Sequence, residues 1–234
     1  MRVSDDALPR RGFLERLATA VVPLTALSIG VRARAAGAQS ASTGGMRPRA
    51  ESSLPPDETW LRDLTGKHRT VFDVATHRDG HALAQAKGFL DAYEQAYDVP
   101  AQDVNLVLGV RGSGLPLVLS DAMWARYRIG EQYGVTGAAA ATRNLFTSAH
   151  AQAGGLVGVE QTVDALQRRG VLVLVCNNTI GGAARKLASA GLGAADAIRA
   201  DLLAGLLPGV VTVPAMVVAF DRMQARGISY VYAG

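Results

Sequence analysis

Cysteine and lysine are both scarce in this chain. It has one cysteine, Cys176, and three lysines among 234 residues. A single cysteine excludes an intrachain disulfide and any zinc site that needs several thiolates. The formal net charge is +4, but six arginines and three acidic residues place +3 of it in residues 1–38. The rest of the chain is nearly neutral and has no basic cluster, so nucleic-acid binding is not expected.

Long hydrophobic runs are absent as well. The apolar stretch from Leu17 to Val31 is interrupted by proline, threonine, serine and glycine, and it is too short and weakly apolar for a membrane span. Pro-Arg-Arg-Gly-Phe-Leu at residues 9–14 precedes it, and Ala-Gly-Ala at residues 36–38 follows. This order of charged, apolar and small residues is typical of a secretory signal. Its Arg-Arg-x-Phe-Leu core resembles a twin-arginine export signal.

We therefore expect residues 1–38 to be a signal peptide that the twin-arginine export machinery recognises and that is cleaved near Ala38. Twin-arginine export implies a bacterial protein that leaves the cytoplasm already folded and works in the periplasm. An uncleaved amphipathic anchor helix is the alternative. Residues 39–57 are rich in serine, glycine, alanine and proline, which predicts a flexible linker.

Residues 58–234 are expected to form one α/β domain. Segments with strand-like patterns alternate there with segments in which apolar residues recur at helical spacing. Five strands separated by helices predict an open, mainly parallel sheet with helices on both faces, in a flavodoxin-like layout. The expected strands cover residues 70–75, 104–110, 171–175, 210–213 and 228–232.

The strand expected at Val171–Val175 is the best candidate for the centre of the sheet. Its five apolar residues, mostly β-branched, are typical of a strand that is covered on both faces. Cys176 follows it directly, and three small polar residues then suit the start of a helix. Open α/β sheets bind ligands where strands end and helices begin, so Cys176 is the candidate catalytic residue. A buried, inert cysteine is the alternative.

The loop expected after the second strand, Arg111-Gly112-Ser113-Gly114, should lie at the same edge of the sheet. A guanidinium, a hydroxyl and a helix start near a thiol suit a small anion. No metal is expected, because His77 and His81 have no third ligand nearby in sequence. No cofactor is expected either, because Gly112-Ser113-Gly114 lacks the third glycine of a dinucleotide fingerprint. The candidate binding residues are Arg111, Ser113, Gly114, Asn177, Asn178 and Thr179.

Four segments, taken together, resemble the DsrE/DsrF-like family of sulfur-relay proteins, especially its exported bacterial members. They are residues 119–127, 169–179, 213–215 and 224–232, and the resemblance covers roughly residues 68–234. It implies a DsrE-like fold and a homo-oligomer. It also implies that Cys176 accepts sulfane sulfur as a persulfide, from a small sulfur-containing anion or a partner sulfur carrier. Arg111-Gly112 stands where relatives often have His-Gly, so this loop lacks the histidine that could transfer a proton in those relatives.

Two hypotheses about function follow, and the sequence leaves open whether the protein is an enzyme. In the first, an exported DsrE-like protein handles sulfane sulfur through a persulfide on Cys176. In the second, a non-catalytic periplasmic module of the same fold binds a ligand or assists assembly. Exposure of Cys176 near Arg111 would favour the first hypothesis. A sulfur atom enclosed by aliphatic side chains would favour the second.

Overall fold

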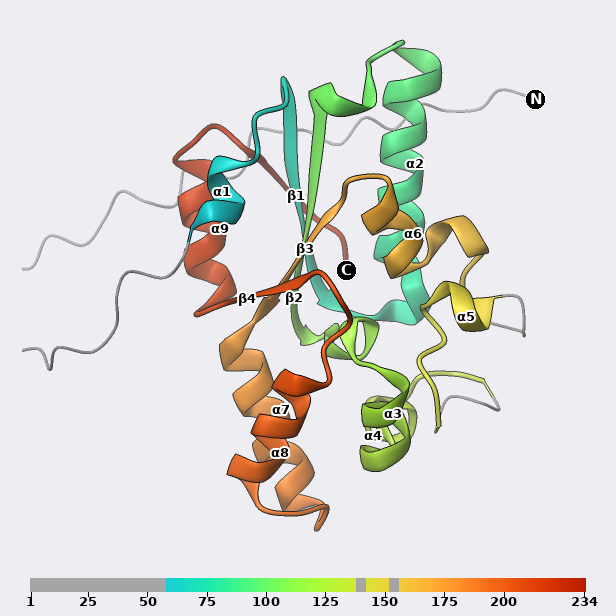
Figure 1. The fold of residues 1–234 in the computed structure, drawn as a ribbon, viewed down its shortest axis with the longest axis vertical. Coiled ribbons are helices and arrows are strands. Elements are labelled where there is room, and N and C mark those ends of the chain that lie inside the picture. Colours follow the sequence, from blue (N-terminus) through green and yellow to red (C-terminus); the bar gives the residue numbers. More distant parts are fainter. Residues whose placement is uncertain (1–57, 138–141, 152–155) are drawn as a thin grey trace, which may run out of the picture. The chain divides into compact units, whose positions relative to one another are not determined.

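The computed structural model of the protein describes residues 58–137, 142–151 and 156–234. The expected signal peptide and linker, residues 1–57, lie outside these ranges. Within them, five strands form one sheet in which every pairing is parallel (Figure 1). The strands are β1 (His68–Thr76), β2 (Val104–Ser113), β3 (Leu172–Cys176), β4 (Val210–Val213) and β5 (Ser229–Tyr232).

The predicted α/β class with an open parallel sheet is confirmed. The strand order is β4-β3-β2-β1-β5. Strands β1 to β4 therefore lie in chain order across the sheet, and β5 lies on the other side of β1. This order differs from the 2-1-3-4-5 order of flavodoxin itself. The expected strands at residues 171–175 and 210–213 agree with β3 and β4 to within one residue at each end.

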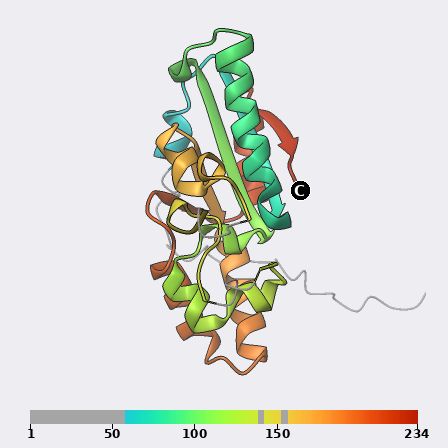
Figure 2. The same ribbon diagram turned by 90° about the vertical axis from the view of Figure 1, so that its right-hand side faces the viewer.

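Helices cover both faces of the sheet (Figures 1 and 2). On one face α1 (Thr59–Arg62) and α9 (Met216–Gln224) pack on an apolar cluster that includes Val71, Val107 and Leu174. On the other face α2 and α6 pack on a larger cluster. The remaining helical bounds are α2 (His81–Ala96), α3 (Asp121–Tyr127), α4 (Ile129–Tyr133), α5 (Ser148–Ala151), α6 (Val163–Arg168), α7 (Asn177–Ser189) and α8 (Ala195–Ala204).

Strand β3 has the buried, two-sided character that its sequence predicts. Val173 and Val175 belong to the larger apolar cluster, whereas Leu174 and Cys176 belong to the smaller one. Successive side chains of a strand point to opposite faces, and helices cover both of these faces. A continuous apolar run is the sequence pattern that such a position requires.

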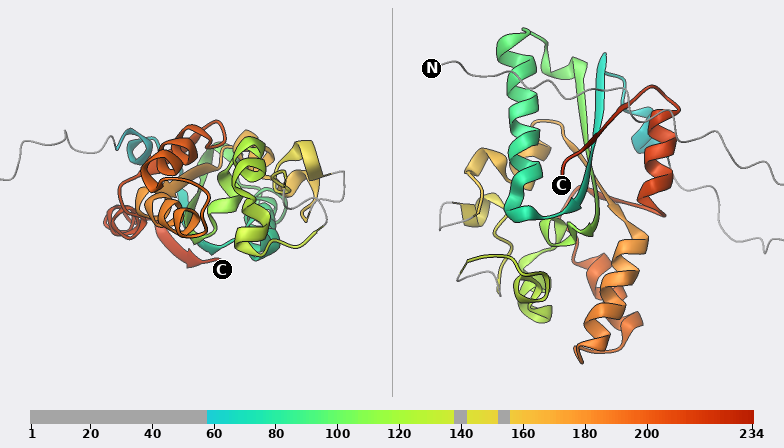
Figure 3. Two further views of the ribbon diagram at one scale, coloured as in Figure 1. Left: turned by 90° about the horizontal axis from the view of Figure 1, so that it is seen from below. Right: turned by 180° about the vertical axis from the view of Figure 1, so that it is seen from behind.

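The bounds of β2 differ most from the prediction. Strand β2 continues through Gly112 to Ser113, which pairs with Thr76 after an irregularity in the β1 register. Residues 115–127 do not form one continuous helix, because Leu119 is extended and forms an isolated bridge with Leu206. A short 3-10 turn, Leu115–Val118, therefore precedes α3. Seen from behind and from below, α7 and α8 lie beyond the carboxyl end of β3 (Figure 3).

Candidate functional site

Cys176 lies at the end of β3, as predicted, but its side chain is enclosed. The residue is 6% exposed and packs in the apolar cluster beneath α9, with Val213 and Met216. The backbone N–H of Met216, the first residue of α9, donates a hydrogen bond to the Cys176 Sγ at 3.4 Å. Cys176 lines neither of the two pockets described below. The sulfur is therefore near two helix starts but is not open to a ligand.

Arg111 belongs to β2 rather than to a loop, and its charge is already paired. Its Nε and Nη2 both donate to the carboxylate of Asp73, each at 2.8 Å, and Tyr230 Oη donates to the same carboxylate at 2.6 Å. Asp73 is 1% exposed. The hydrogen bond to Asp73 raises the pKa of Arg111 further above its usual value. Arg111 thus neutralises a buried carboxylate of this chain.

Arg111 and Cys176 are nevertheless neighbours in the sheet. Val110 and Val175 are register partners, so Arg111 and Cys176 are the next residues along two adjacent parallel strands. They share the face that α9 covers, because side chains two apart in a strand lie on one face and Phe220 of α9 packs over Gly109. The two residues are therefore adjacent on one face of the sheet, while the contacts of their side chains come from elsewhere in the chain.

A pocket at the carboxyl ends of β2 and β3 brings two predicted residues together. Its volume is about 390 Å³, and Ser113 and Thr179 line it with Lys186. The backbone N–H of Gly112 donates to Thr179 Oγ1 at 3.0 Å. We call this the rim pocket; its lining residues are Gly112, Ser113, Gln132, Tyr133, Thr179, Gly182, Ala183 and Lys186.

The electrostatics of the rim pocket favour an anion. Lys186 Nζ lies 4.1 Å from the centre of the Tyr133 ring and donates to the backbone oxygen of Gln132. None of the described residues that line the pocket is acidic, so they do not balance the ammonium charge of Lys186. Desolvation raises the pKa of Tyr133 to about 12, and its hydroxyl therefore stays protonated at neutral pH. The Ser113 hydroxyl donates to the backbone oxygen of Ala75 at 3.4 Å, so Lys186 is the main attractive group of the pocket, and an ammonium group without a carboxylate partner suits a small oxyanion.

The other predicted residues have different surroundings. Gly114 is buried, and a Cβ there would lie 2.7 Å from the backbone oxygen of Val74, so its role is close packing. Asn177 Oδ1 accepts a hydrogen bond from Arg199 at 2.8 Å, and Asn178 is exposed. His77 Nε2 lies 3.0 Å from the backbone oxygen of Tyr133. Across the described ranges there is no group of three or more histidine, cysteine or acidic residues arranged to hold a metal ion.

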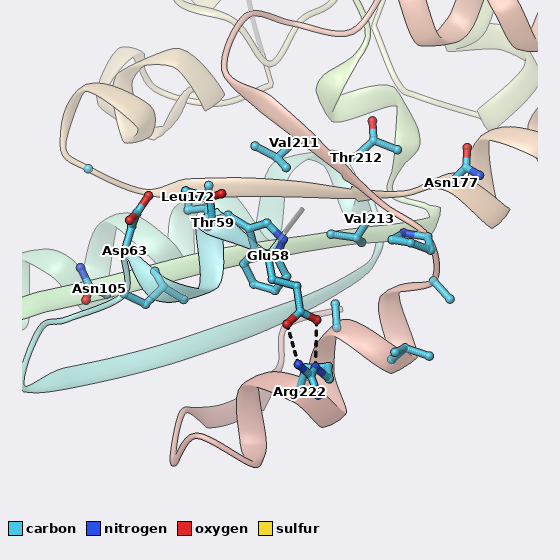
Figure 4. Close-up of a pocket in the computed structure, with 17 residues that line it drawn as sticks. Glu58, Thr59, Asp63, Asn105, Leu172, Asn177, Val211, Thr212, Val213 and Arg222 are labelled. Atoms are coloured by element: carbon cyan, nitrogen blue, oxygen red, sulfur yellow. Dashed lines mark hydrogen bonds and ion pairs between the residues drawn. The ribbon is translucent and has the colours of Figure 1, made fainter. Parts of the chain in front are cut away.

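A second and larger pocket was not predicted from the sequence. It has a volume of about 800 Å³ and lies between α1, α9 and strands β3 and β4 (Figure 4). Its walls come from four separate parts of the chain, which no local pattern reveals. One feature of the sequence could have indicated it: Val217 and Val218 are apolar residues of α9 that lie outside its buried face. Their side chains are 67% and 55% exposed. We call it the α9 pocket.

The fold and the rim pocket together define an α/β protein with an open parallel sheet and an anion-suited pocket at the carboxyl edge. No protein-family model matches the chain, and no curated protein matches it in sequence. A solved structure of a protein of unknown function from Methanobacterium thermoautotrophicum, MTH1491, is similar with a TM-score of 0.39 and 16% identity. The match covers 70% of this chain and 98% of that chain. In the described ranges no helix is long and apolar enough to cross a membrane.

Proposed function

We propose that this protein is an exported, DsrE-like binding module that holds a small anion, such as a sulfur oxyanion, in the rim pocket. The observation that carries the proposal is the convergence of Ser113, Thr179 and the unbalanced Lys186 on one pocket. Open parallel sheets bind ligands at this edge. The burial of Cys176 favours this non-catalytic module over persulfide chemistry.

Thiosulfate binding, measured by titration calorimetry, tests the proposal. Lys186→Met removes the ammonium group and should weaken binding at least about ten-fold, since a hydrogen bond to a charged group contributes about 1.5–3 kcal/mol. Arg185→Met is the matched control, because Arg185 is the exposed neighbour on α7 and does not line the pocket. Equal binding by wild type and Lys186→Met would refute the proposal.

Persulfide formation on Cys176 is the second candidate, and one observation favours it. The Met216 N–H and the start of α7 direct positive partial charge at the sulfur. Mass spectrometry after exposure to polysulfide distinguishes the two candidates. A mass increase of one sulfur atom on Cys176 supports the relay. A free thiol under conditions in which thiosulfate binds the rim pocket supports the binding module alone.

Export by the twin-arginine route is part of the same proposal. It is supported by the Arg10-Arg11 pair, the short apolar run after it and the small residues up to Ala38. Replacing both arginines by lysine in the full chain should keep the protein in the cytoplasm with an uncleaved amino terminus. Amino-terminal sequencing of the wild-type protein from the periplasm should begin at Gln39. Periplasmic protein that still begins at Met1 would favour the anchor instead.

A further inference from the structure

The α9 pocket is separate from the rim pocket and differs from it in chemistry. The two share no lining residue. The α9 pocket is elongated, with Asp63 and Asn105 toward one end and Asn177 toward the other (Figure 4). Its volume of about 800 Å³ falls in the range of about 300–1,000 Å³ that is usual for small-molecule sites. It is therefore large enough for a ligand of drug-like size.

Most of the wall of the α9 pocket is apolar. Leu64 and Trp60 contribute from the α1 side, Leu172 and Val213 from β3 and β4, and Val218 from α9. Burial of apolar ligand surface against such a wall gains about 25 cal/mol per Å². A charged or strongly hydrated group placed against this wall would lose its hydrogen bonds to water and gain none from the protein. The wall thus selects a ligand whose body is largely apolar.

The charged groups at the α9 pocket are not balanced. Arg222 donates to both carboxylate oxygens of Glu58, at 2.9 and 2.6 Å, so these two charges neutralise each other (Figure 4). The Asp63 side chain makes no hydrogen bond or ion pair with any part of the chain that the structure describes. No positive side chain there neutralises its carboxylate. The lining therefore has a net charge of −1, from Glu58, Asp63 and Arg222. The Trp60 ring adds an aromatic surface, which attracts cations.

We infer that the α9 pocket binds a small amphipathic cation, an amine with an aliphatic or aromatic body. The apolar wall holds the body, and Asp63 with Trp60 receives the ammonium group. This site is independent of the anion in the rim pocket and goes beyond the function proposed above. Cys176 lies directly behind the pocket wall, since its neighbour Asn177 and its strand partner Val213 both line the pocket.

Fluorescence of the uncharged dye N-phenyl-1-naphthylamine tests the site in the full chain. The dye should bind saturably, and octylammonium should displace it at a concentration at least about ten-fold lower than octanoate. These two competitors have the same apolar body and opposite charge. Asp63→Asn should remove the preference for octylammonium and leave the affinity for the dye unchanged. Unsaturable dye binding, or equal displacement by both competitors, would overturn the inference.

A pair of adjacent valines supplies the matched control. Val218 lines the pocket, whereas its more exposed neighbour Val217 does not. Val218→Lys should weaken binding of both the dye and octylammonium at least about ten-fold, and Val217→Lys should bind both as the wild type does. Circular dichroism melts of both variants should show folded proteins. Sedimentation of the unliganded proteins is the second readout: an oligomer that Val218→Lys dissociates would show that the pocket is an interface between copies, and the inference would fail.

Discussion

At the residue scale, Cys176 ends a central strand, but its side chain is buried. The sulfur is 6% exposed, and Val213 lies against it from the neighbouring strand. We predict that an aromatic disulfide reagent modifies the native thiol at least roughly 100-fold more slowly than the unfolded chain, because modification requires local opening. Val213→Ala should speed the reaction, whereas Val211→Ala, two residues earlier on β4, should not. A native rate equal to the unfolded rate would show an open thiol.

Asp164 gives the chain a predictable response to acid. Burial alone would raise its pKa, but hydrogen bonds from Ser148 and Arg168 outweigh burial and lower it from 3.8 to about 2. A carboxylate with a lowered folded pKa contributes stability above its unfolded pKa and loses it as the pH falls through the folded value. We predict a loss of about 1 kcal/mol, after allowance for solvent screening, between about pH 4 and pH 2.

Urea unfolding at several pH values measures this effect. Asp164→Asn should lower the free energy of unfolding at pH 6 by about 1 kcal/mol and flatten its dependence on pH in the acid range. Asp196→Asn is the control, since Asp196 occupies the equivalent first turn of α8 and makes no side-chain hydrogen bond to the rest of the described chain. A wild-type slope retained in Asp164→Asn would contradict the assignment to this carboxylate.

At the scale of elements, two glycines should respond in opposite ways to alanine. Gly88 lies in the middle of α2, and a Cβ there would contact nothing within 4 Å. Gly88→Ala should stabilise the protein by about 0.5–1 kcal/mol. On β2, a Cβ at Gly109 would lie 2.5 Å from the Phe220 ring of α9, so Gly109→Ala should destabilise it by about 1–3 kcal/mol. Thermal and urea unfolding compare both variants; effects of equal sign would refute the packing of α9 on β2.

The elements show which features local sequence can predict. Strand β3 was predictable because a strand covered on both faces needs an uninterrupted apolar run. The extension of β2 through Gly112 was not, because it depends on pairing with β1 rather than on local propensity. The same limit applies to the site. Arg111 was identified, but its partner Asp73 is 38 residues away and Tyr230 is 157 residues from Asp73, so only the folded chain shows that the charge is already paired.

For the whole molecule, the edge of the sheet that β5 forms bears on the expected homo-oligomer. On β5 three large side chains are exposed: Tyr230 at 40%, Val231 at 41% and Tyr232 at 60%. In the described chain β5 pairs with β1 alone, so its outer backbone groups are available to another strand. Stable monomers protect such edges with charge, proline or a covering segment. An uncharged edge with aromatic residues is instead typical of a surface that pairs with a second copy.

We predict that the protein self-associates through β5, and the symmetry of the contact makes this testable. When two copies of one strand pair antiparallel about a two-fold axis, each residue meets its own counterpart or a symmetric partner. A single Val231→Lys substitution therefore places two like charges at the contact and should shift sedimentation velocity toward monomer. Val231 is the suitable position because Tyr230 also bonds to Asp73. Tyr97→Lys, at an exposed site just after α2, controls for the loss of an apolar side chain. A wild-type chain that sediments as a monomer at all accessible concentrations would exclude this edge as an interface.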